Sequence, residues 1–193
     1  MKTQKRVVLG IALGLAGTSI AMADPSALNL VRSGDNYIGI QSRDKILEMY
    51  SEKSIATVEP NVWHILYYDP DVTFKAADVK FGAGQEMEVT HPMHPVHMFG
   101  MPAKTSDIID QSRVHVDSDQ ALNIATSQPL LRGLTLRSTK MTLDNGDTGP
   151  AWKVDLYAAK LSDPTKEAYV GNVCISATDK SVLKVDLHPD SAQ

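Results

Sequence analysis

The chain has 193 residues, of which 42% are hydrophobic and 22% are charged, a composition typical of globular proteins. Its formal net charge is −4 at pH 7, and an acidic surface repels nucleic acid and anionic lipid, so we expect no partner of either kind. Cys174 is the only cysteine, which excludes an internal disulfide. The length is sufficient to bury the core of one or two domains.

The N-terminal residues have the pattern of a bacterial secretory signal. A basic start with three of the 19 basic residues is followed by an apolar run over 7–16 and by Ala21-Met22-Ala23, a small-x-small cleavage site. The apolar run is too short to span a hydrocarbon core of roughly 30 Å. We therefore predict a signal peptide over 1–23, a periplasmic or secreted location and no membrane anchor after cleavage. Removing the three basic residues leaves 16 against 23 acidic ones, a net charge of −7.

Residues 24–90 are predicted to form a helix packed on a small antiparallel sheet. Ser42 is a good helix N-cap, and the apolar residues between Ile46 and Tyr50 recur near helical spacing, which predicts a helix over Ser42–Lys53. Alternating and turn-bounded segments after this helix predict strands at 62–68, 74–81 and 85–90.

Residues 113–188 repeat this order with clearer alternation. Asp117 or Ser118 is expected to cap a helix over 117–125. Trp152 begins an alternating run that is expected to face inward together with Val154 and Leu156. Strands are predicted at 134–143 and 151–157, with a hairpin over 173–183 and a turn at 144–147.

The two segments together predict an α+β protein of two tandem units, each a helix packed on a small antiparallel sheet. Aligning Trp63 with Trp152 also matches Ile65 to Val154, which indicates an internal duplication.

The second unit resembles a PepSY domain. The resemblance lies in Ser118-x-x-Ala121-Leu122-x-Ile124-Ala125, Pro150-Ala151-Trp152-x-Val154-x-Leu156 and Val173-x-Ile175-x-Ala177-Thr178-x-x-x-Val182-Leu183. PepSY domains are similar small helix-and-sheet units found in bacterial secreted proteins and in propeptides of certain metallopeptidases. The tandem layout is also similar to that of the secreted beta-lactamase inhibitor protein. The resemblance implies a non-catalytic module that binds a protein partner or inhibits a peptidase.

Residues 91–112 are predicted to link the two units and are rich in proline, histidine and methionine. The prolines favour polyproline II, whose three residues per turn place His91, His94 and His97 on one side, with Met98 nearby. Imidazole binds zinc and copper, and a thioether favours Cu(I). Neighbouring histidines in such an extended segment are about 9 Å apart, which is long for one ion. Two interpretations stay open: a linker alone, or a linker that holds copper or zinc through these four residues.

No segment has the pattern of a reaction centre. Gly82-Ala83-Gly84-Gln85 lacks the residues that complete a phosphate loop, and Asp144-Asn145-Gly146-Asp147 lacks the later ligands of a calcium loop. No nucleophile elbow is present. We therefore predict that the protein is not an enzyme and has no cofactor. The alternative function is an extracytoplasmic transition-metal-binding protein that uses the histidine segment.

Overall fold

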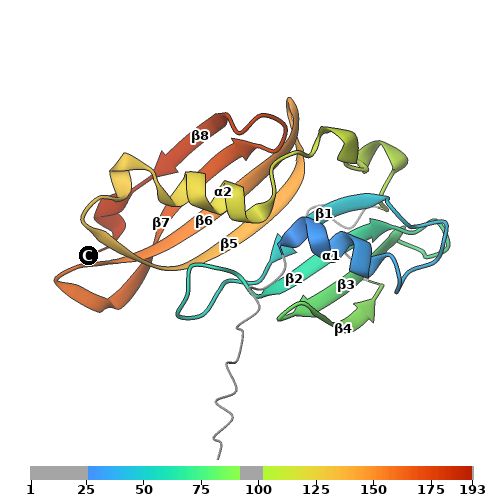
Figure 1. Cartoon of the computed structure of the whole chain (residues 1–193), viewed down its shortest axis with the longest axis horizontal. Coiled ribbons are helices and arrows are strands. Elements are labelled where there is room, and N and C mark those ends of the chain that lie inside the picture. The colour runs from blue at the N-terminus through green and yellow to red at the C-terminus, as the bar shows by residue number, and fades with distance from the viewer. Residues whose placement is uncertain (1–25, 92–101, 193) are drawn as a thin grey trace, which may run out of the picture.

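A computed structural model describes residues 26–91 and 102–192 (Figure 1). Eight strands form one antiparallel sheet in the order β4-β3-β2-β1-β5-β6-β7-β8. Along the chain, the elements are α1 (Ala27–Gly34), β1 (Ile46–Ser51), β2 (Val62–Tyr68), β3 (Ala76–Gly82), β4 (Gln85–Thr90), η1 (Thr105–Asp107), η2 (Gln111–Arg113), α2 (Ser118–Thr126), η3 (Pro129–Leu131), β5 (Leu134–Gly146), β6 (Gly149–Lys160), β7 (Asp163–Ser176), β8 (Val182–Leu187) and η4 (Pro189–Ser191).

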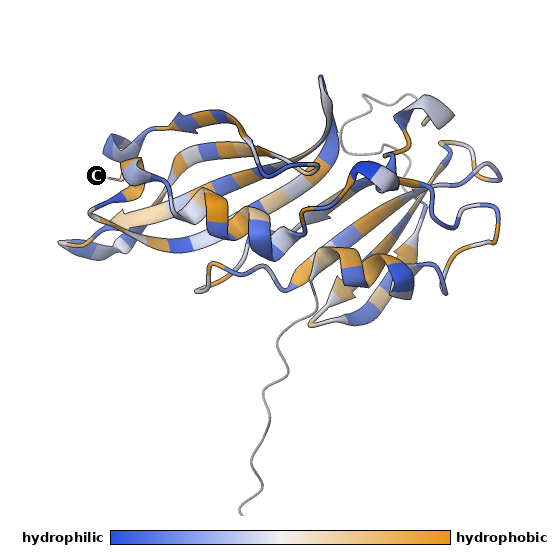
Figure 2. Ribbon diagram, turned by 45° about the horizontal axis from the view of Figure 1, so that its top comes forward, coloured by the Kyte–Doolittle hydropathy of each residue, from blue (hydrophilic) through white to orange (hydrophobic). Residues whose placement is uncertain are grey.

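The helices α1 and α2 lie on the same face of the sheet, α1 over the strands around β2 and α2 over β6 and β7 (Figure 1). Their apolar residues and alternate residues of the strands form one hydrophobic core, to which Ile65, Val154 and Val173 contribute. Figure 2 shows the alternation of polar and apolar residues along the strands. We call the covered side the helix face and the opposite side the helix-free face. None of the described helices is long and apolar enough to cross a membrane.

The sheet overturns the predicted fold class of two tandem units, each a helix on a small sheet. Strand β1 pairs with β5 through Met49 with Leu143 and Tyr50 with Thr142. This pairing joins all eight strands into one large antiparallel sheet with few helices. The α+β tandem-repeat description is therefore wrong, because the strands of the two segments were expected to close two separate sheets.

The helix predicted over Ser42–Lys53 is also wrong, since this segment contains strand β1. A bulge between Ile46 and Glu48 interrupts the alternation, so that Ile46 and Met49 both reach the core on the helix face. Leu47 is instead buried on the helix-free face against Ala103. Ile46, Leu47 and Met49 are thus all buried, and their spacing imitates that of the apolar face of a helix.

The first helix lies earlier in the chain than expected. Ala27, Leu30, Val31 and Gly34 are its buried residues, and they recur at the i, i+3, i+4, i+7 spacing of an amphipathic helix. The Tyr67 hydroxyl donates a hydrogen bond of 2.9 Å to the Val31 carbonyl, which fastens α1 to β2.

The N-termini of the two helices meet. Asp117 is the N-cap of α2, as predicted, and its Oδ1 accepts hydrogen bonds from the backbone N–H groups of Ser118 and Leu28. The Ser118 hydroxyl in turn accepts the N–H of Ala27 at 3.0 Å. Unpaired first-turn donors of both helices are therefore satisfied by the same two side chains.

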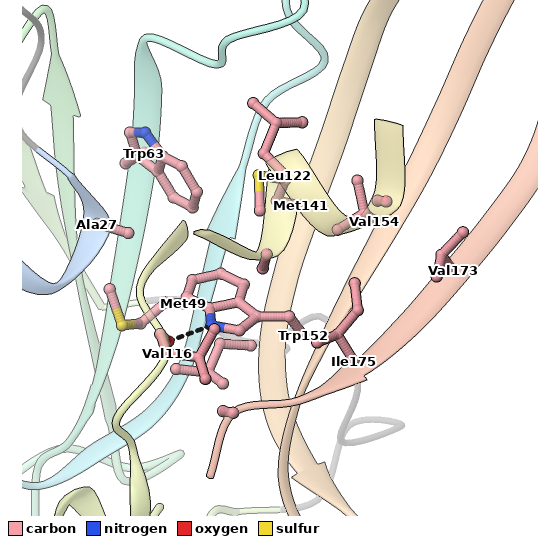
Figure 3. Close-up of a cluster of buried hydrophobic side chains, with 14 of the residues drawn as sticks. Ala27, Met49, Trp63, Val116, Leu122, Met141, Trp152, Val154, Val173 and Ile175 are labelled. Atoms are coloured by element: carbon pink, nitrogen blue, oxygen red, sulfur yellow. Dashed lines mark hydrogen bonds between the residues drawn. The ribbon is translucent and has the colours of Figure 1, made fainter. Parts of the chain in front are cut away.

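Two tryptophans pack together in the centre of the core (Figure 3). Trp63 on β2 and Trp152 on β6 lie edge to face, with ring centroids 6.1 Å apart and an interplanar angle of 82°. The indole N–H of Trp152 donates to the Val116 carbonyl at 2.8 Å, and that of Trp63 donates to the Pro60 carbonyl at 3.2 Å. The inward orientation predicted for Trp152 is confirmed, because this side chain is fully buried.

Candidate functional site

The helix-free face carries polar and aromatic side chains that the hydrophobic core does not use. They form two groups that meet at the end of β1, where Glu52 belongs to one group and Lys53 to the other. The histidine cluster consists of Glu48, Tyr50, Glu52, His64, Asp78 and Lys80. The tyrosine patch consists of Lys53, Asp155, Tyr157, Glu167, Tyr169 and Asn172.

Strand register assembles the histidine cluster. Tyr50 lies opposite His64 and His64 lies opposite Lys80, so the three side chains share one face of β1, β2 and β3. The His64 ring stacks on Tyr50 with centroids 4.5 Å apart. Its Nδ1 lies 2.8 Å from Asp78 Oδ2, and its Nε2 lies 3.4 Å from Glu52 Oε1.

These contacts favour a charged imidazole. Burial alone would lower the pKa of His64, but the hydrogen bond and negative charge of Asp78, with a further contribution from Glu52, raise it above its ordinary value. Lys80 Nζ lies 2.6 Å from Glu52 Oε1, and this hydrogen bond lowers the pKa of the Glu52 carboxyl. Burial and the nearby Asp144 raise the pKa of Glu48 to about 8. The cluster therefore combines ion-paired acidic and basic side chains with one carboxyl whose pKa lies above neutral pH.

The geometry of His64 bears on two kinds of chemistry. Both ring nitrogens face carboxylates, and within the described residues neither is hydrogen-bonded to a hydroxyl or thiol that it could activate as a nucleophile. Within residues 26–91 and 102–192, no group of three or more His, Cys, Asp or Glu side chains is arranged to hold a metal ion. His64 is therefore held between two carboxylates, which favour its protonated form.

The tyrosine patch is built across β6 and β7. The rings of Tyr157 and Tyr169 are 5.4 Å apart between centroids and tilted by 59°. Lys53 Nζ lies 4.0 Å from the centre of the Tyr157 ring and also pairs with the Glu167 carboxylate. Tyr169 remains 44% exposed. The patch therefore presents an aromatic surface with a cation held over one ring.

Hydrogen bonds fix the exposed ring of this patch. The Tyr169 hydroxyl donates to Asp155 Oδ1 at 3.2 Å and accepts from the Asn172 side-chain amide at 3.1 Å. The Ser138 hydroxyl donates to Glu167 at 2.8 Å, which holds the carboxylate that Lys53 contacts. The orientation of the aromatic surface is thus fixed by contacts within the chain.

The predicted metal ligands are described only in part. His91 follows β4, is exposed, and its Nε2 lies 3.8 Å from Asp69 Oδ2. His94, His97 and Met98 lie outside the described residues, as does the predicted signal peptide. Copper or zinc binding by this segment stays a prediction.

Sequence reasoning did not find either group on the helix-free face. Tyr157 projects on the helix-free face, and a register shift between β6 and β7 sets Tyr169 opposite it. Cys174 lies on the helix-free face opposite Lys153 and is half-buried. Burial raises the pKa of its thiol, which disfavours the reactive thiolate.

No protein-family model matches the chain, and the comparisons with curated proteins and with solved structures gave no significant match. The resemblance to PepSY domains therefore stays a prediction.

Proposed function

We propose that this chain is a non-catalytic, exported binding protein that holds a protein partner on its helix-free face, with the tyrosine patch at the centre of the contact. The observation that carries the proposal is the Tyr157–Tyr169 pair, in which exposed aromatic surface is held in place by Lys53, Asp155 and Asn172. Tyrosine concentrates binding energy in protein interfaces because it buries a large apolar ring and keeps a polar hydroxyl.

The chemistry of the patch indicates what kind of partner it fits. Lys53 and Glu167 place both signs of charge beside the aromatic rings. A protein surface with an apolar centre and a mixed polar rim matches this arrangement. The sequence resemblance to PepSY domains supports a protein, and a peptidase in particular, as the partner.

An aromatic pair on a sheet also stabilises the fold, because cross-strand aromatic contacts contribute about 0.2–1 kcal/mol. The test must therefore separate binding from folding. Tyr37 provides a matched control, since it is a tyrosine of similar exposure, 49%, that contacts Phe81 of the core on the helix face.

The experiment is a quantitative pulldown from the periplasmic and secreted fractions of the producing bacterium. Immobilised wild type, Tyr157→Ala/Tyr169→Ala and Tyr37→Ala are compared after each is shown to be folded by circular dichroism. We expect one protein to be retained in stoichiometric amount by wild type and Tyr37→Ala, and at least about tenfold less by the double variant. Equal retention by all three proteins, or no stoichiometric partner, would contradict the proposal.

A further inference from the structure

Strand β8 is an outer edge of the sheet, and its two charged residues, Lys184 and Asp186, are of opposite sign (Figure 1). Val182, Leu183 and Val185 are each at least 40% exposed. The opposite edge, β4, carries Glu86 and Glu88 on its exposed strand, and charges of one sign keep edge strands from pairing with copies of themselves. The two edges therefore differ in whether they tolerate a further strand.

Alternate residues of β8 direct their backbone N–H and C=O groups away from the sheet. The N–H of His188 donates to the Val170 carbonyl of β7, and the register continues through Asp186 and Lys184 opposite β7 residues. Because antiparallel strands bond through every second residue, 184, 186 and 188 face β7. The N–H and C=O groups of Leu183, Val185 and Leu187 then point away from the sheet.

We propose that two copies of this chain pair through β8, antiparallel and centred on Val185, so that one continuous sheet runs through both copies. In this register Val185 meets its own equivalent, and Leu183 meets Leu187 of the second copy. These are the residues whose backbone groups point outward, so each pair exchanges two hydrogen bonds.

Charge complementarity fixes the same register independently. Lys184 lies opposite Cys174 and Asp186 opposite Asn172, so both project on the helix-free face. Pairing centred on Val185 sets Lys184 opposite Asp186 of the second copy, and the converse, in the positions where side chains of antiparallel strands approach most closely. The existing Lys184–Asp186 pair of 3.0 Å becomes part of a square of alternating charges.

Other self-pairings are less favourable. Pairing of β8 centred on Lys184 would set two lysines opposite each other and would use backbone groups already bonded to β7. Pairing of β4 centred on Met87 would set Glu86 opposite Glu88 in both directions. Opposed like charges destabilise a strand pair, so β8 is the edge that suits a second copy.

Sedimentation velocity on the purified mature chain over a range of concentrations tests the proposal without any other protein. We expect a dimer of wild type, a dimer of the β4 control Met87→Asp, and a monomer of Val185→Asp, which places two carboxylates at the two-fold axis. Asp186→Lys should weaken dimerisation about tenfold by opposing lysines, and Lys184→Asp/Asp186→Lys should restore it. A monomeric wild type, or a Val185→Asp dimer as stable as wild type, would overturn the proposal.

A cysteine placed at the axis tests the register directly. Opposed residues of a bonded antiparallel pair have Cα atoms about 5.5 Å apart, within the range of a disulfide. On mild oxidation, Cys174→Ser/Val185→Cys should form a covalent dimer, while Cys174→Ser/Met87→Cys should stay monomeric. If only the Cys174→Ser/Met87→Cys protein cross-links, the interface lies on β4 and the assignment to β8 is wrong.

Discussion

Replacing Trp152 should be among the most damaging single changes to the fold. Its side chain is fully buried, contacts Trp63 edge to face and donates a 2.8 Å hydrogen bond to the Val116 carbonyl (Figure 3). Truncation to alanine removes the ring and leaves that carbonyl without its donor.

The expected magnitude follows from these contacts. Trp152→Ala should lower the free energy of unfolding by about 3–5 kcal/mol through the cavity that it leaves, and the unsatisfied carbonyl of Val116 adds about 1–3 kcal/mol. Trp152→Phe keeps an aromatic ring but not the N–H, so it should cost about 1–3 kcal/mol. Lys153→Ala, one residue along on the helix-free face, should cost under about 0.5 kcal/mol.

Urea unfolding followed by far-ultraviolet circular dichroism measures all of these values. A double-mutant cycle between Trp63→Leu and Trp152→Leu, which removes both rings, should give a coupling energy of about 0.5–1.5 kcal/mol, because the rings are in contact. Equal losses for Trp152→Ala and Lys153→Ala would refute the assignment of strand faces. Zero coupling between the tryptophans would refute the edge-to-face contact as a stabilising link between β2 and β6.

Three further predictions concern a cap, a titrating carboxyl and a glycine. Asp117→Ala should cost about 1–2 kcal/mol in thermal unfolding, because its carboxylate caps both helices, and an unchanged midpoint would refute that role. The pKa of Glu48 rises from 4.5 to about 8 on folding, so its contribution to stability is complete below 4.5 and is lost as pH rises through 8. Glu48→Gln should therefore gain stability relative to wild type over that interval, and parallel pH profiles of the two proteins would contradict the burial of this carboxyl. Gly171→Ala should lower the free energy of unfolding in denaturant more than Gly133→Ala does. Both glycines have positive φ, but only at Gly171 would an added Cβ collide with backbone, 2.0 Å from the Asp186 carbonyl oxygen. Equal losses for the two variants would argue against this close approach.

Much of the strand layout was accessible from the sequence. Val62–Tyr68 was predicted with the observed bounds, and the alternation around Trp152 gave the correct buried face, because period-two burial is a local property. The N-cap at Asp117 was equally local.

The predictions that were wrong concerned features that depend on contacts between distant segments. The bulge at Ile46 and the burial of Leu47 against Ala103 gave β1 an apolar spacing close to that of a helix. The pairing of β1 with β5, which joins the two expected sheets into one, cannot be predicted from the sequence of either strand alone. The spacing of Ala27, Leu30, Val31 and Gly34, in contrast, was a readable helix signal that was overlooked.

The candidate site was less accessible than the fold. His64 gains its two acidic neighbours from β3 and from the end of β1, and Tyr157 gains Tyr169 through a shifted register. Such groupings arise from strand order and bulges, which composition and periodicity do not determine.

Site-specific photo-crosslinking in the producing cell tests most directly whether the helix-free face binds a protein. A photoreactive residue replaces Lys153, whose side chain is 48% exposed on the helix-free face, or Tyr37, which is 49% exposed on the helix face. We predict a discrete adduct with a different protein, identified by mass spectrometry, from position 153 and not from position 37. Adducts from position 37 alone, or from neither position, would contradict the account.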